Sequence, residues 1–337
     1  MKIFELDDSA DLGLLEPGNR GALDRSSVWD RRQASEPSRS APAPAWEPKA
    51  AERRMTNVRA NTKSLKMHVL ELGHLRLDKN FMVANSTIAT HKNPNPRGQV
   101  LDIPVSAYYI EHPDGNVLFD TGCHPDWGGA NGRWPEALQE LFPHIGGEEC
   151  MLPARLEAMG IGPDDIKHVV MSHLHCDHAG CVEYFRKSQI IVHEDEFAGA
   201  FRQYALQDHS SPYVIKDLER MIRAELHWRE VGREEPDQKI VDGVRLLNFG
   251  PGHARGMIGL EVSLRSEPGV ILVSDACYTA ENYGPAKQPG ISYDSLGIAR
   301  TVRRIKALAG DTGFTVWFGH DAPQFATVRK STEGYYE

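Results

Sequence analysis

The pattern of hydrophobic and polar positions divides the chain into two parts. From residue 66 onward, short apolar runs rich in Val, Ile and Leu are separated by turn residues, which is typical of buried strands. These runs are 67–72, 103–110, 116–119, 168–171, 189–192, 244–249, 259–264, 269–273 and 314–318. Helical spacing of apolar residues occurs in 153–159, 194–205, 215–226 and 295–309. The mixture of strands and helices predicts an α/β layered domain over 66–337.

Residues 1–65 lack this pattern. In 35–49, Ser, Pro, Ala and Arg alternate without helical or strand periodicity. Such a segment buries too little apolar surface to offset the entropy lost on ordering. We therefore predict a disordered N-terminal extension over 1–65, followed by a single domain over 66–337. Two further interpretations of the extension stay open: a binding tail, and sequence translated upstream of a start at Met67.

The composition narrows the function classes. Of the 337 residues, 40% are hydrophobic and 25% are charged, which excludes collagen, coiled-coil and disulfide-scaffold proteins. Nearly all of the net charge of −9 lies in 66–337. A domain with this acidic excess is a poor non-specific binder of nucleic acid or anionic lipid, because phosphate contacts need a surplus of Lys and Arg.

The sequence also predicts the cellular setting. No segment approaches the roughly 18 apolar residues that span a bilayer, and the Arg-Arg pairs at 31–32 and 53–54 precede polar sequence rather than the apolar stretch of an export signal. We therefore expect a cytoplasmic protein with no membrane partner. The five cysteines are odd in number and form no C-x-x-C pair, so we expect free thiols.

Candidate chemistry concentrates directly after the apolar run 168–171. His173, His175, Asp177 and His178 follow it within six positions, a density that core packing does not require. On an extended strand end, His173 and His175 project to one side and can hold one ion. Asp177 and His178 follow a bend and can reach a second ion. Imidazole and carboxylate ligands suit Zn²⁺, and manganese, iron and cobalt accept similar ligands.

Three later strands end in the same way. The runs 244–249, 269–273 and 314–318 are followed by His253, Asp275 and His320, respectively. Loops held by rigid strands at one sheet edge are common places for functional residues. We therefore expect these side chains to complete a two-metal site.

The order of these residues resembles the motif of the metallo-β-lactamase superfamily. The resemblance implies an αββα sandwich with two metal ions, taken here as Zn²⁺, at one edge. It assigns His173, His175 and His253 to the first ion, Asp177, His178 and His320 to the second, and Asp275 as the bridge between them. Asp120, in the Phe119-Asp-Thr-Gly122 turn, resembles a supporting residue that orients ligands.

A narrower resemblance begins with Tyr278, three residues after Asp275. It matches the active-site tyrosine of N-acyl-homoserine lactonases, and the sequence around 131–135, 178–184, 208–213, 274–279 and 330–337 is similar to one subgroup of these quorum-quenching enzymes. The likeness covers 67–337. It implies a carboxylic ester hydrolase that opens the lactone ring by attack of a metal-bridging hydroxide, with Tyr278 stabilising the oxyanion and Asp177 carrying a proton to the leaving oxygen.

The expected partner is a small-molecule lactone, and a homodimer is compatible with the sequence. Alternatives within the superfamily are another lactone hydrolase or a thioester hydrolase; from another class, a metal-bound sensor or interaction protein stays open. The cluster 81–83 is expected either to form a wall of an acyl-chain pocket or to lie at a core edge. Cys176 should face away from His175 and Asp177, and either lines the pocket or packs in the interior.

Overall fold

The computed structural model describes residues 64–209 and 212–337. The predicted N-terminal extension, 1–65, lies outside this part of the chain except for Ser64 and Leu65. Leu65 is only 4% exposed and belongs to the hydrophobic core. The packed domain therefore includes at least one residue that the sequence pattern assigns to the extension.

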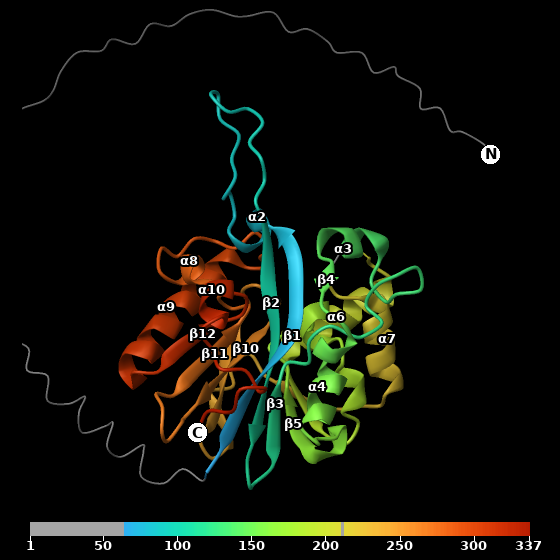
Figure 1. The fold of residues 1–337 in the computed structure, drawn as a ribbon, viewed down its shortest axis with the longest axis vertical. Coiled ribbons are helices and arrows are strands. Elements are labelled where there is room, and N and C mark those ends of the chain that lie inside the picture. The colour runs from blue at the N-terminus through green and yellow to red at the C-terminus, as the bar shows by residue number, and fades with distance from the viewer. Residues whose placement is uncertain (1–63, 210–211) are drawn as a thin grey trace, which may run out of the picture. The chain divides into compact units, whose positions relative to one another are not determined.

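Two β-sheets form the centre of the domain (Figure 1). The seven-stranded sheet has the order β4 (His144–Ile145), β1 (Lys66–Asp78), β2 (Val100–Glu111), β3 (Asn116–Phe119), β5 (Ile166–Val170), β6 (Gln189–His193) and β7 (His227–Val231). The five-stranded sheet has the order β12 (Thr315–Phe318), β11 (Val270–Ser274), β10 (Met257–Val262), β9 (Val244–Gly250) and β8 (Gln238–Val241). Strands β3, β5, β6 and β7 run parallel, as do β11 and β12.

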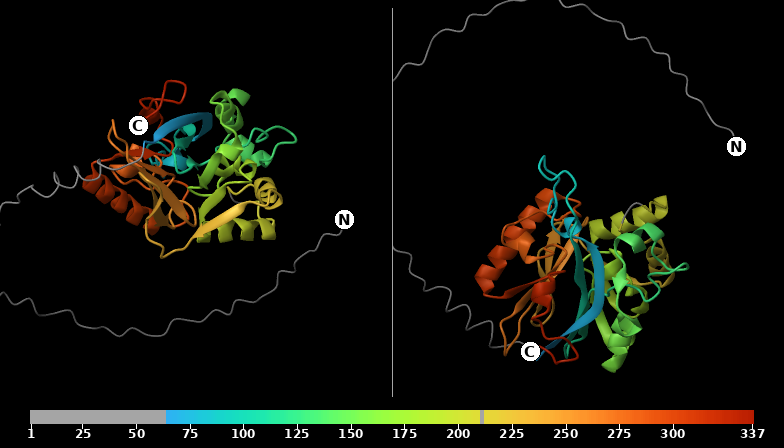
Figure 2. Two further views of the ribbon diagram at one scale, coloured as in Figure 1. Left: turned by 90° about the horizontal axis from the view of Figure 1, so that it is seen from below. Right: turned by 45° about the horizontal axis from the view of Figure 1, so that its top comes forward.

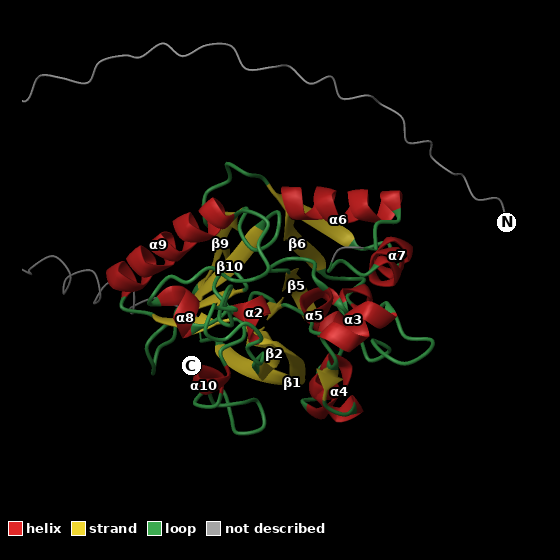
Figure 3. Ribbon diagram, turned by 90° about the horizontal axis from the view of Figure 1, so that it is seen from above, coloured by secondary structure: helices red, strands yellow, loops and turns green. Residues whose placement is uncertain are grey.

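Helices cover the outer faces of the two sheets (Figure 3). On the seven-stranded sheet they are α3 (Glu136–Leu141), α4 (Leu152–Ala158), α6 (Glu194–Leu206) and α7 (Ile215–Arg223). On the five-stranded sheet the long helix is α9 (Ser295–Thr312). Short helices are α2 (Lys79–Met82), α5 (Cys176–Ala179), α8 (Ala280–Tyr283) and α10 (Ala322–Phe325), with 3₁₀ turns at Glu148–Cys150, Pro163–Asp165 and Val182–Tyr184.

The layering follows from which strand faces are apolar. Val69, Phe119 and Val170 of the first sheet pack against Leu246 and Leu260 of the second, and all five are fully buried. The outer faces form two further cores under the helices. A sheet that is apolar on both faces must be covered on both, so the result is the αββα sandwich predicted from the sequence.

Every predicted strand and helix overlaps an observed one, but strands β4, β7 and β8 and the short helices α2, α3, α5, α8 and α10 were not predicted. The three missed strands lie at sheet edges. In β7 only the last residue, Val231, is buried, and in β8 only Val241. An edge strand of this kind needs no apolar run, so the hydrophobic pattern gives little sign of it.

The two ends of the described domain meet. Tyr336 near the C-terminus pairs with Met67 at the start of β1, and each backbone N–H donates to the other's carbonyl at 2.8–2.9 Å. Figure 2 shows this end of the chain beside the first strand. No helix within 64–209 and 212–337 is both long and apolar enough to cross a membrane.

Candidate metal centre

The predicted ligands come from four loops that follow strands. His173 and His175 lie in the loop after β5, Asp177 and His178 in the first turn of α5, and His253, Asp275 and His320 follow β9, β11 and β12. Strands β3 and β5 run parallel in one sheet, and β11 and β12 run parallel in the other. The loops that follow these strands lie at the same edge of the sandwich. This shared direction brings residues together that are up to about 150 positions apart in the sequence.

The local geometry agrees with the expectation for the ligands. Strand β5 ends at Val170, the backbone of His175 is still extended, and α5 begins directly after it at Cys176. Asp177 and His178 therefore follow a turn of the chain, as predicted. Cys176 lines the same cavity as His175 and Asp177, which is one of its two predicted roles, but it does not face away from them, because these residues enter a helical turn and do not alternate as in a strand.

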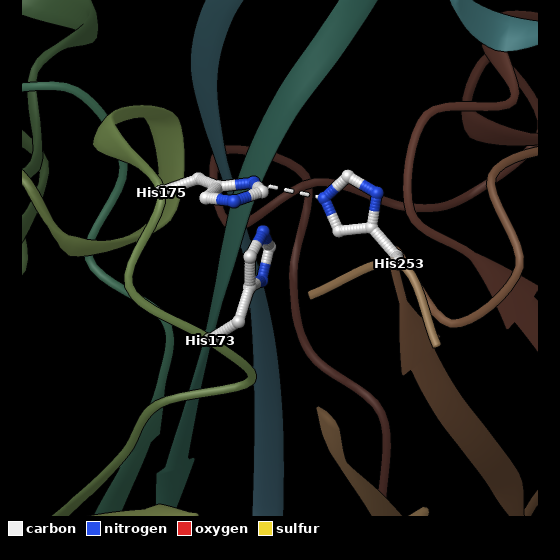
Figure 4. Close-up of side chains that lie close together, drawn as sticks. All are labelled: His173, His175 and His253. Atoms are coloured by element: carbon white, nitrogen blue, oxygen red, sulfur yellow. Dashed lines mark hydrogen bonds between the residues drawn. The ribbon is translucent and has the colours of Figure 1, made fainter. Parts of the chain in front are cut away.

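One group of ligand atoms comes from His173, His175 and His253. One ring nitrogen of each lies within 4.8 Å of the others, and Figure 4 shows the three rings converging. His253 Nε2 and His175 Nδ1 are 2.8 Å apart. Burial, reinforced by neighbouring imidazoles, lowers the pKa of His173 and His175 well below the usual value. These rings are therefore neutral and present lone pairs, as metal ligands require.

A second group comes from Asp177, His178 and His320. Asp177 Oδ2 lies 3.4 Å from His178 Nε2 and 3.6 Å from His320 Nε2. Asp275 stands between the two groups, because its Oδ2 is 3.3 Å from His253 Nε2 while its Oδ1 is 3.0 Å from His320 Nε2. One carboxylate thus faces both sets of imidazoles.

The second group favours positive charge. Burial opposes a charged imidazole at His178, but Asp177, Asp275 and Asp120 outweigh it and raise the pKa well above its usual value. The pKa of His320 is raised for the same reason, with Asp275 the main partner. The carboxylates that stabilise protons on these imidazoles would also stabilise a metal cation, which takes the place of those protons when it binds.

Asp120 fixes two of these imidazoles from outside. It accepts hydrogen bonds from the Ser172 backbone N–H at 2.7 Å and the Ser172 hydroxyl at 2.8 Å, and it lies 2.9 Å from His178 Nδ1. Because the Ser172 hydroxyl donates to Asp120, it accepts from His173 Nδ1 at 2.9 Å. Both Nδ1 atoms therefore carry the proton, which turns the Nε2 lone pairs of His173 and His178 inward.

His253 and His320 are held in the same way. His320 Nδ1 lies 2.8 Å from the Pro104 carbonyl oxygen, and His253 Nδ1 lies 3.3 Å from that of Ile291 and 2.8 Å from the Tyr278 hydroxyl. A carbonyl oxygen only accepts, so each Nδ1 carries the proton and each Nε2 faces the cluster.

The cluster fits bound metal ions on its own geometry. His173 Nε2 and His178 Nε2 are buried and have no hydrogen-bond partner. Buried polar atoms without a partner are rare and costly, and both lie in one group of possible ligand atoms with a carboxylate oxygen of Asp275. Imidazole and carboxylate ligands that surround a bridging Asp275 suit two ions.

Glu196 is a functional residue that the sequence pattern does not reveal. This fully buried residue of α6 accepts hydrogen bonds from the backbone N–H groups of Leu174 at 2.9 Å, Arg255 at 3.0 Å and Gly256 at 3.3 Å. Burial raises its pKa to about 7 against the effect of these bonds. It ties the loop of His173 and His175 to the loop of His253. In the sequence it is one of three acidic residues in the first turn of a helix, with nothing to distinguish it.

A cavity opens beside the cluster. His175, Asp177, His253, Asp275 and His320 form one wall together with Tyr278, and the remainder is mainly apolar: Leu75, Leu77, Met82, Ile103, Trp134, Leu138, Phe142, Cys176, Pro212 and Ile291. Of the cluster 81–83, Met82 lines the cavity, Phe81 packs its ring against Phe142 at 4.8 Å, and Val83 is buried. Both predicted roles, pocket wall and core edge, are therefore present.

The amino-acid sequence is similar to a known protein family and to individual enzymes. The sequence profile of the Metallo-beta-lactamase superfamily matches residues 100–320. The chain is 55% identical to an N-acyl homoserine lactonase AiiB of Agrobacterium fabrum over 81% of its own length and 99% of the relative, and 53% identical to one of Rhizobium rhizogenes with the same coverage.

Solved structures agree with this similarity. A structure of an N-acyl homoserine lactone hydrolase with the product N-hexanoyl-L-homoserine bound at the catalytic metal centre is 27% identical, with a TM-score of 0.68, and the match covers 82% of this chain and 100% of that one. The chain belongs to the metallo-β-lactamase superfamily and, within it, to the N-acyl homoserine lactonase family. The predicted family and enzyme class are thereby confirmed.

Proposed function

We propose that this enzyme hydrolyses the lactone ring of N-acyl-L-homoserine lactones to give N-acyl-homoserines. The observation that carries the proposal is the 55% identity over nearly the whole length of an N-acyl homoserine lactonase. The cluster of five histidines and two aspartates beside a mainly apolar cavity supports it, because the substrate joins a small polar ring to an apolar acyl chain.

Two metal ions, which we propose to be Zn²⁺, would be held by the residues that the sequence motif predicts. His173, His175 and His253 would hold the first ion; Asp177, His178 and His320 would hold the second; and Asp275 would bridge both. Once bound, such ions supply Lewis acidity and lower the pKa of a coordinated water to near neutrality, which provides a nucleophile.

Tyr278 is suited to stabilise the lactone carbonyl oxygen as negative charge develops on it. Its hydroxyl lies 2.8 Å from His253 Nδ1. If that nitrogen carries its proton, as the nearby Ile291 carbonyl favours, the Tyr278 oxygen is an acceptor there and its own proton can point into the cavity that it lines. Burial raises the pKa of Tyr278 well above its usual value, which keeps the hydroxyl protonated. A fixed donor of this kind acts most strongly where charge appears only in the transition state.

Asp177 is suited to return a proton to the leaving oxygen. It lines the cavity on the same wall as Tyr278, and the imidazoles of His178 and His320 lower its pKa despite burial. The side chain is therefore ionised at neutral pH and can accept a proton from the attacking water. It then transfers this proton to the alkoxide that forms when the ring C–O bond breaks.

A substrate panel tests the proposal. Protein loaded with two equivalents of zinc should release acid from N-acyl-homoserine lactones in a pH-stat, with a higher kcat/KM than for unrelated lactones or thioesters. Asp177→Asn should reduce the rate strongly. A higher kcat/KM for thioesters would favour the alternative hydrolase, and no turnover of any ester by a folded, zinc-loaded protein would favour a sensor or interaction protein.

Three further proposals rest on the sequence. We propose a disordered extension over 1–65 ahead of the domain 66–337, a cytoplasmic location, and a homodimer without nucleic-acid or membrane partners. Limited proteolysis tests the first, cell fractionation the second, and light scattering of the purified protein the third.

A further inference from the structure

Arg255 lies at the edge of the metal centre in a second cavity. This cavity has a volume of about 170 Å³ and shares His175, Pro212, His253 and Ile291 with the cavity of Tyr278. Its other lining residues are Gln203, Tyr213, Ala254, Arg255, Ser292 and Tyr293. The two cavities therefore meet at the ligand imidazoles, one mainly apolar and the other containing a guanidinium group.

Three contacts fix the position of Arg255. Its backbone N–H donates to Glu196 Oε2 at 3.0 Å. Its side chain crosses α6 at Gly199, where a Cβ atom would lie 1.9 Å from Arg255 Cδ, so only glycine leaves room for it. Its guanidinium carbon lies 4.7 Å from the centre of the Tyr293 ring, which is a favourable cation–π distance. The group is thus held in place before any ligand binds.

The guanidinium group has no anionic partner. Within residues 64–209 and 212–337, it forms no ion pair and no side-chain hydrogen bond. Several other partly buried arginines are paired with carboxylates: Arg133 with Asp217 and Glu183, Arg245 with Glu261, and Arg304 with Asp237. Arg155 donates instead to the Glu71 carbonyl oxygen. Partly buried charge is normally paired, and a guanidinium offers a planar fork of donors that matches a carboxylate. The free fork of Arg255 therefore suits an anion that enters the site.

Gln203 also lines this cavity. Its Nε2 donates to Asp208 Oδ2 at 3.2 Å, and its Oε1 is buried without a partner. Because that oxygen has almost no accessible surface, the charged group that the cavity offers to a ligand is the guanidinium of Arg255. An N-acyl-homoserine carries a carboxylate that complements it.

We propose that Arg255 binds the carboxylate of the ring-opened product. The inference rests on the proposed function: hydrolysis adds water to a neutral lactone and yields an alcohol, a carboxylate and one released proton. The carboxylate is the only charge that distinguishes product from substrate. Arg255 gains a charge-assisted partner only after ring opening, so it selects for product and sets how strongly product inhibits.

Calorimetric titration of the zinc-loaded protein tests this with two probes, N-hexanoyl-L-homoserine and its neutral carboxamide. Wild-type protein should bind the carboxylate more tightly, and Arg255→Gln should reduce that preference by about tenfold or more, as expected for loss of a charged hydrogen-bonded pair. Arg255→Lys keeps the charge but not the fork and should retain part of the preference. Arg303→Gln removes the same charge from an exposed site on α9 and should leave the preference unchanged.

The outcomes distinguish failure of the proposed role of Arg255 from failure of the proposed lactone hydrolysis. Equal preference for carboxylate over carboxamide in wild type and Arg255→Gln, with lactone hydrolysis intact in the wild type, would overturn the role of Arg255 alone. An equal loss in Arg303→Gln would also overturn it, since a general charge effect would then explain the result. Absence of lactone hydrolysis by the wild-type enzyme would overturn both the proposed function and this inference.

Discussion

Replacing Glu196 with alanine tests how the ligand loops are held together. The carboxylate accepts hydrogen bonds from three backbone N–H groups: those of Leu174 and Gly256, which are buried, and that of Arg255, which is partly buried. Each buried donor left without a partner costs about 1–3 kcal/mol. Two of the bonds are short and the third, at 3.3 Å, is weaker, so we expect Glu196→Ala to lower the free energy of unfolding by about 3–5 kcal/mol.

The same change should weaken the metal centre. Leu174 lies between His173 and His175, and Arg255 and Gly256 follow His253, so release of the three bonds loosens both loops of the first group. Residues that orient ligands typically contribute about 10–100-fold to metal affinity or activity. Glu196→Gln keeps one carbonyl oxygen and should show an intermediate loss in both quantities.

Urea denaturation of metal-free and zinc-loaded protein measures the stability, and zinc retention after dialysis measures the affinity. Glu140→Ala removes an exposed carboxylate on α3 and serves as the control, with an expected change within about 0.5 kcal/mol. A loss below about 1 kcal/mol for Glu196→Ala, together with unchanged zinc retention, would refute the view that this carboxylate holds the loops.

Three further predictions concern the site and its surroundings. Tyr278→Phe removes only the hydroxyl and should lower kcat/KM by about 10–100-fold at unchanged zinc content; an unchanged kcat/KM would exclude the oxyanion contact. Asp120→Asn tolerates the positive φ of 62° but provides a weaker acceptor for His178, so dialysis should show about 10–100-fold weaker zinc binding; wild-type retention would contradict this. Burial and the nearby Arg133 lower the pKa of His124 to about 4 from 6.5. Its folded state favours the neutral form, so stability present above pH 6.5 is lost as the pH falls toward 4. The loss should be about 2 kcal/mol after allowance for solvent screening, and His124→Gln should remove that part of the slope in urea titrations at pH 4.5 and 7. An equal slope in the variant would count against the assignment.

The sequence located the candidate ligands because of where they stand relative to strands. His253, Asp275 and His320 each follow an apolar run, and each of the corresponding strands buries at least two residues. Strands β4, β7 and β8 were missed because each buries only one residue. Hydrophobic periodicity reports burial, so it finds β12 although that strand lies at a sheet edge, and it overlooks edge strands that bury little.

Side-chain direction was less predictable. Cys176 was expected to face away from His175 on strand alternation, but the chain enters α5 at that point; of its two predicted roles, lining the cavity is the one observed. Glu196 and Arg255 were not singled out at all. Each is a common charged residue whose role depends on partners far away in the chain: Glu196 on Leu174 and Gly256, and Arg255 on Gly199 and Tyr293.

The sequence by itself therefore determined the layered fold, the superfamily and the seven candidate ligands, because local apolar runs and a dense His/Asp motif are properties of neighbouring residues. The bridging position of Asp275 and the supporting role of Asp120 were expected from the resemblance. Only the tertiary structure decided that Ser172 and the carbonyl oxygens of Ile291 and Pro104 orient three further imidazoles, so that four lone pairs turn inward. It also decided that Arg255 has no counter-ion within 64–209 and 212–337. These features arise where loops from two different sheets meet, and contacts between distant segments leave no periodic trace in the chain.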